Sequence, residues 1–239
     1  MKEAFSLNGK DITFEEAIKY FGEKLPIKAD DFYKLPNKYK AITFTVSGYT
    51  KAQVLEKFHQ ELLEAIKNGT TMRDFKNNMN EFLENKGYEG ISAFQADNIF
   101  RTNVQSAYDA GHYEQLTDPD VMNARPIWLY DAVEDKRTRY SHLLMNNRAF
   151  RADNPIWDTW YPPNGFKCRC TVISLSVRQA KAMGIIVENE APIAGEIDGK
   201  FISIFPDPKF AYNPAKIAFK PDLKGYHEPI KNVFESIQS

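Results

Sequence analysis

The chain has 239 residues, 43% of them hydrophobic and 26% charged, and its formal net charge at pH 7 is −1. This composition is typical of a globular protein with a sizeable core. The near-neutral charge disfavours a dedicated nucleic-acid-binding protein, which normally carries a basic excess. No stretch reaches the roughly 18 apolar residues that a membrane-spanning helix needs, and the first ten residues lack the apolar core of a signal peptide. We therefore expect a chain that is made and folded in the cytosol and has no membrane partner.

The front of the chain predicts a mainly helical region, because apolar residues recur there at helical spacing in four segments. These segments are residues 13–22, 50–67, 70–86 and 91–116. Asn68-Gly69 after the second segment and Asp118-Pro119 after the fourth are typical helix terminators. Residues 42–46 alternate apolar and polar side chains, which predicts a short strand.

The rear of the chain has a different texture, with many charged residues, Asn, Trp and Pro between short apolar runs. The expected strands are residues 126–130, 171–175 and 201–205, and the expected helices are residues 176–183 and 228–237. The fold class predicted is α+β. A helical region at residues 1–117 precedes a smaller mixed α/β region at residues 118–239 with a short sheet, and the two can pack as one domain.

Three soft metal ligands are concentrated in the rear region. Cys168 and Cys170 are the only cysteines, and His142 is one of four histidines. Two cysteines are too few for a disulfide scaffold, and a bridge between positions i and i+2 would be strained. Thiolate and imidazole are ligands that zinc prefers, and Asp135 or Asp131 could add an oxygen. The pattern indicates a candidate zinc site formed by Cys168, Cys170, His142 and Asp135.

Two other interpretations of these residues stay open. Cysteine is small, apolar and often buried, so the pair could simply pack into one core. Cys168 with His142 and a carboxylate could also form a nucleophilic set. No nucleophile turn or oxyanion hole supports that second interpretation, so we assign no catalytic residue.

Arg169 lies between the two cysteines, so its side chain is expected to project away from them. An arginine fork fits a carboxylate with two parallel hydrogen bonds. We expect Arg169 to pair with Asp131 or Asp135 and to fix the loop structurally.

Several segments carry a family resemblance when they are taken in order. They are residues 16–26 (EAIKYFGEKLP), 68–75 (NGTTMRDF), 101–113 (RTNVQSAYDAGHY), 125–128 (RPIW), the D-x-R-x-x-x-x-H pattern of Asp135, Arg137 and His142, 161–170 (YPPNGFKCRC) and 207–214 (DPKFAYNP). Together they resemble the phage Mu F-like family of minor head proteins, also called the head morphogenesis family. The segment at 161–170 is the most specific. Lys209 and Ala215 depart from the pattern, because glycine is common at both positions.

The resemblance implies a minor head protein of a Mu-like tailed phage or prophage. Such a protein is assembled in the cytoplasm of the bacterial host and lies inside the virion head near the portal. The portal and other head proteins are the implied partners, and packaged phage DNA is a further candidate. The family has no established enzymatic activity, so we expect a non-enzyme. The structural signature residues are Arg137, Pro162, Pro163, Gly165 and Arg169.

Two alternatives belong to other functional classes. A metal-dependent hydrolase or nuclease could use the same His and Cys residues, with Asp131 or Glu134 as general base. A DNA-associated protein ejected with the genome would bind DNA with a steep dependence on salt.

Overall fold

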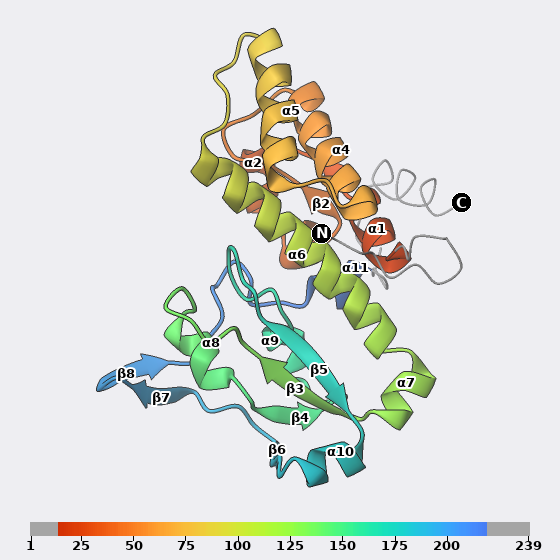
Figure 1. Cartoon of the computed structure of the whole chain (residues 1–239), viewed down its shortest axis with the longest axis vertical. Helices are drawn as coiled ribbons and strands as arrows, with labels where there is room; N and C mark the ends of the chain where they lie inside the picture. The colour runs from red at the N-terminus through yellow and green to blue at the C-terminus, as the bar shows by residue number, and fades with distance from the viewer. Residues whose placement is uncertain (1–13, 219–239) are drawn as a thin grey trace.

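The computed structural model describes residues 14–218, and the helix expected at residues 228–237 lies outside them. The described residues form an α+β fold, which confirms the predicted class. The long helices belong to the N-terminal half, and most strands belong to small sheets in the C-terminal half (Figure 1).

Four helices of the front half confirm the four predicted segments. They are α1 (Glu15–Gly22), α4 (Ala52–Asn68), α5 (Met72–Asn85) and α6 (Ala93–Leu116). Gly69 ends α4 in the left-handed conformation, with φ of 69°. Thr71 and Ser92 begin α5 and α6 with capping boxes, in which side chain and backbone satisfy each other's hydrogen bonds. Local capping therefore fixes the end of α4 and the starts of α5 and α6.

Short elements connect the first two long helices. They are β1 (Leu25–Pro26), α2 (Ala29–Lys34), α3 (Asn37–Lys40) and β2 (Thr43–Phe44). The strand predicted at residues 42–46 is shorter than expected, because only β2 pairs, in parallel, with β1. The flanking Ile42 and Val46 are nevertheless buried.

A four-stranded sheet with the order β5-β3-β4-β6 organises the rear half. Its strands are β3 (Ile127–Asp131), β4 (Ala149–Arg151), β5 (Thr171–Leu175) and β6 (Val187–Glu188). The central strand β3 is antiparallel to both neighbours, with Leu129 opposite Ile173 on one side and Ala149 on the other. A separate antiparallel hairpin is formed by β7 (Ala194–Ile197) and β8 (Lys200–Ser203).

Short helices fill the connections of the rear half. They are α7 (Pro119–Ala124), α8 (Tyr140–Met145), α9 (Trp157–Trp160), α10 (Val177–Ala182) and α11 (Pro214–Ala218). The strands expected at 126–130, 171–175 and 201–205 correspond to β3, β5 and β8, and the helix expected at 176–183 corresponds to α10. Each of the helices α7 to α11 is much shorter than α6.

The helix α6 supplies side chains to two hydrophobic cores. Ala107 and Ala110 are buried in the front core, and Leu116 is buried in the rear core. Tyr113 packs against both cores. Figure 1 shows α6 running from the bundle of α4 and α5 down to the sheet. This one helix therefore joins the two halves.

The last helix of the described residues, α11, lies on the front half. The helix α11 packs against α6 and α3, and its Ala215 is buried in the front core. The division at residues 117 and 118 stays a prediction.

Within residues 14–218, none of the helices combines the length and the apolar character that crossing a bilayer requires.

A close approach of α1 to α6 depends on Gly111. A Cβ atom added at Gly111 would lie 2.7 Å from the backbone nitrogen of Ala17 and 2.9 Å from the ring of Phe14. Backbone cannot move aside as a flexible side chain can, so the site accepts only a hydrogen atom. Glycine in the middle of α6 is therefore required by packing, despite its poor helix propensity.

We predict that Gly111→Ala destabilises the fold by about 1–3 kcal/mol, because the added methyl group forces α1 away from α6. Urea unfolding followed by circular dichroism measures this change. Gly22→Ala is the matched control, because its new Cβ would meet Leu63 at an ordinary 3.7 Å. The control is expected to be neutral or slightly stabilising. Equal unfolding midpoints for the two variants would contradict the prediction.

Candidate functional site

His142, Cys168 and Cys170 meet in the core of the rear half. His142 lies on α8, and the two cysteines lie in the segment that leads into β5. His142 Nδ1 is 3.3 Å from Cys170 Sγ and 3.8 Å from Cys168 Sγ. The three ligating atoms all lie within 4.8 Å of one another. Their side chains are buried, with exposed fractions of 2% for His142, 4% for Cys168 and 2% for Cys170.

The segment at residues 161–170 has an irregular backbone that positions the cysteines. Pro162 and Pro163 are buried and joined by a cis peptide bond, and Lys167 has a positive φ of 56°. Gly165 lies under the guanidinium of Arg139, which a Cβ atom there would meet at 2.9 Å. This segment has no regular hydrogen-bond ladder, so specific side-chain contacts must hold it.

Asn164 is one of those contacts. Its side chain is fully buried, and its Oδ1 accepts a 2.8 Å hydrogen bond from the hydroxyl of Tyr130 on β3. Its backbone N–H also donates to the Cys168 sulfur. The central strand of the sheet therefore anchors the turn immediately before the cysteines.

The two thiols of the cluster differ in their acidity. The hydrogen bond from Cys170 lowers the pKa of Cys168 well below its usual range, and His142 acts in the same direction. The same contact with Cys168, together with burial, raises the pKa of Cys170. Cys168 is therefore the first of the pair to ionise, with Cys170 donating its S–H to the thiolate.

Asp135 lies outside this group of three, and its carboxylate forms hydrogen bonds with Arg169 and Arg137 instead. The two nitrogens Nη1 and Nη2 of Arg169 donate to its oxygens at 2.7 and 2.6 Å. The backbone N–H of Arg137 donates to Oδ1 at 2.9 Å, and its side chain to Oδ2 at 3.2 Å. Asp135 therefore ties the loop before α8 to the cysteine segment, 34 residues later in the chain.

The other acidic candidates of the sequence also lie outside the group of three. Asp131 ends β3, opposite Thr171 of β5. Glu134 accepts a 2.6 Å hydrogen bond from the side chain of Asn146.

Asp109 on α6 is a candidate that the sequence reasoning missed. Only 1% of this residue is exposed. Its Oδ1 accepts a 3.0 Å hydrogen bond from Gln105, while its Oδ2 is buried without a hydrogen-bond partner. Burial raises the pKa of Asp109 well above its usual range, and the nearby Cys168 adds to the effect. The one sequence signal is its place among small residues, Ala107, Ala110 and Gly111, that let α6 pack closely.

Comparison with known proteins gives one family and two relatives. The profile of a family described as "Phage Mu protein F like protein" matches residues 56–173, which include all four residues of interest: Asp109, His142, Cys168 and Cys170. The Mu-like prophage FluMu F protein of Haemophilus influenzae is 34% identical over 171 residues, which are 66% of this chain and 41% of that protein.

The second relative is described as "Putative capsid assembly protein F" of Escherichia phage Mu. It is 29% identical over 245 residues, which are 87% of this chain and 55% of that protein. The chain thus spans about half the length of the curated relatives it matches. No solved structure matches the chain.

We predict that Asp135→Asn lowers the stability of the fold at neutral pH. The Arg169 guanidinium holds the pKa of the Asp135 carboxyl well below its usual range. A carboxyl whose pKa is lower in the folded than in the unfolded chain adds stability above the unfolded value of about 4, and this stability is lost as the pH falls below it. Urea unfolding midpoints at pH 7 and near pH 3 measure the effect.

The matched control is Asp153→Asn, which breaks an exposed ion pair with Arg151 two residues away. We expect a smaller loss for this control at pH 7, because the pair bridges no distant segments. Equal losses for both variants, or an Asp135→Asn loss that persists unchanged at low pH, would contradict the prediction.

Proposed function

The chain belongs to the phage Mu protein F-like family, and from this premise we propose that it is a minor head protein of a Mu-like tailed phage or prophage. In this role it acts by contacts with the portal and other head proteins during head assembly. It lies inside the head near the portal and is assembled in the cytoplasm of the bacterial host.

The observation that carries the proposal is the similarity to a capsid assembly protein of phage Mu over 87% of this chain. The chain covers 55% of that relative, so the role of the whole relative is transferred here as a proposal.

The buried position of the His and Cys cluster supports a non-enzymatic role. A hydrolytic metal site needs a position that substrate can reach and a base beside it. His142, Cys168 and Cys170 are each at most 4% exposed. Asp131 and Glu134 do not belong to the group of three ligating residues. The arrangement suits a group that stabilises the rear half better than one that turns over a substrate.

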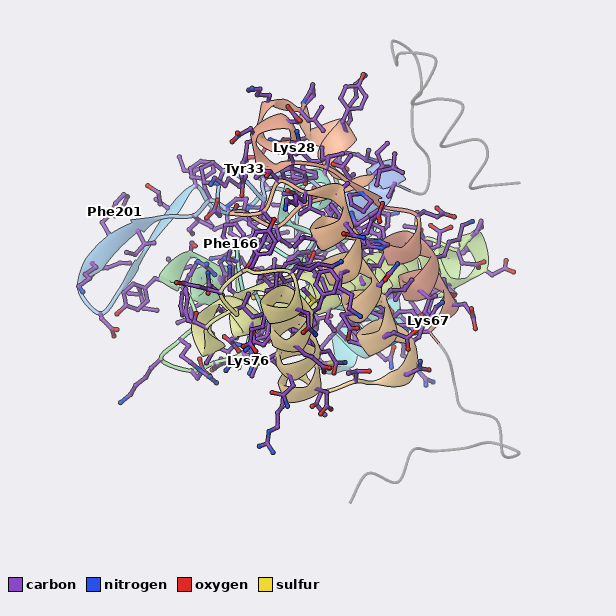
Figure 2. All side chains as sticks on the ribbon, turned by 90° about the horizontal axis from the view of Figure 1, so that it is seen from above. Lys28, Tyr33, Lys67, Lys76, Phe166 and Phe201 are labelled. Atoms are coloured by element: carbon purple, nitrogen blue, oxygen red, sulfur yellow. The ribbon has the colours of Figure 1, made fainter. Side chains whose placement is uncertain are left out.

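The β7–β8 hairpin is the surface that we assign to contact with a head protein. Figure 2 shows Phe201 on this hairpin, which projects from the body of the molecule. Phe201 is 79% exposed, Phe205 62% and Ile193 76%. The backbone N–H of Ile204 donates to the carbonyl of Ile193, so Ile193 and the residue after Ile204, Phe205, both lie at the base of the hairpin. Exposed apolar side chains are typical of protein–protein contact sites.

The portal is the partner that we propose for this hairpin, because the family resemblance implies a protein that lies near the portal. A DNA partner has less support, because the formal net charge of the chain is −1 and a DNA-binding surface normally carries a basic excess. The hairpin itself presents two phenylalanines, and aromatic anchors of this kind dominate the binding energy of protein interfaces.

We predict that Phe201→Ser combined with Phe205→Ser reduces incorporation of the protein into procapsids by about tenfold or more, because two apolar anchors are lost. Copies per particle are measured by quantitative mass spectrometry of procapsids assembled with the variant in place of the parent. Circular dichroism establishes that the variant is folded.

Phe94→Ser is the matched control, because Phe94 is 73% exposed but lies at the start of α6 in the front half. Near-parental incorporation is expected for it. If the double variant is incorporated as well as the control, the hairpin is not the contact. If the parent itself is absent from procapsids, the proposed role is wrong.

A further inference from the structure

The geometry of His142, Cys168 and Cys170 matches the coordination of a zinc ion. Zinc binds sulfur at about 2.3 Å and histidine nitrogen at about 2.0–2.1 Å, so a tetrahedral arrangement separates the sulfur and nitrogen atoms by about 3.6 Å. The two distances from His142 Nδ1 to the sulfurs are 3.3 and 3.8 Å, on either side of that value. These two distances fit one ion between the imidazole and each sulfur, and all three atoms lie within 4.8 Å of one another.

The surroundings of the cysteines support a bound cation. Two thiolates balance the double charge of zinc, so a buried, neutral unit forms when both protons leave to solvent on binding. The backbone N–H of Asn164 already donates to the Cys168 sulfur. Donors of this kind hold metal-bound thiolates in place. Asn164 itself is fixed by its hydrogen bond with Tyr130.

Three protein ligands leave one tetrahedral position of zinc for a further ligand.

We propose that His142, Cys168 and Cys170 bind one zinc ion in the rear core. This site joins two parts of the chain: α8 and the cysteine segment before β5. The bound ion is structural, because the ligands are buried and the position is closed to substrate. This inference rests on the geometry of the cluster and is independent of the proposed role in head assembly.

The first experiment is elemental analysis of the full chain, purified under reducing conditions. We expect about one zinc ion per chain. Cys168→Ser, Cys170→Ser and His142→Gln should each lose most of it. The matched control is His112→Gln, which removes another partly buried imidazole, on α6, that lies outside the cluster. This control should retain the parental zinc content.

A second measurement on the unmodified chain keeps the test decisive if the ligand variants fail to fold. Zinc is removed with a chelator and then added back at about a hundredfold excess over its Kd, which should raise the melting temperature by about 5–10 °C. Cobalt added in place of zinc should give the sulfur-to-metal charge-transfer absorption of thiolate ligation. Cys168→Ser should weaken that absorption.

One result would overturn the inference. If the chain holds no zinc, and neither zinc nor cobalt shifts its melting temperature or its spectrum, the cluster is a packing and hydrogen-bond motif. That result does not bear on whether the protein enters procapsids, so the two proposals fail independently.

Discussion

The structure depends on one helix that is packed along most of its length. With 24 residues, α6 extends over about 36 Å and contributes to a core at each end. A helix that contributes to two cores does not need one continuous apolar stripe. It does need small residues wherever another element crosses it closely. Gly111 meets this need on the side of α1. Asp109, two residues earlier, is buried on the same helix.

In the rear half, side-chain contacts hold a long irregular segment in one conformation. The segment at residues 161–170 contains a cis peptide and a non-glycine residue with positive φ, and backbone pairing does not organise it. Side chains hold it instead: Asp135 binds Arg169 from one side, Tyr130 binds Asn164 from the sheet, and His142 contacts both cysteines. These contacts reach the segment from three different elements, so each restricts a different direction of movement. A zinc ion at the cysteines would add the strongest of these restraints.

The sequence was informative where the physical signal is periodic and much less so where it is local. The long helices follow from apolar spacing and capping residues, and β3 and β5 follow from apolar runs. Elements such as β4, β6 and α9 have two to four residues, which is too short for any period to show. The proximity of His142 to the cysteines was anticipated from residue chemistry. The pairing of Asp135 with Arg169 and Arg137 depends on contacts in three dimensions. The burial of Asp109 could not be predicted either, because a lone carboxylate on a helix normally faces solvent.

The return of α11 to the front half changes how the rear half is attached. Residues 117–213 leave the helical part at the end of α6 and re-enter it at α11, which packs on α6 and α3. A body held by a single connection can turn about any axis through it, whereas a body held at two separated points can turn only about the line that joins them. A partner that contacts both halves therefore has fewer relative orientations to fix on binding, which lowers the entropy cost of association.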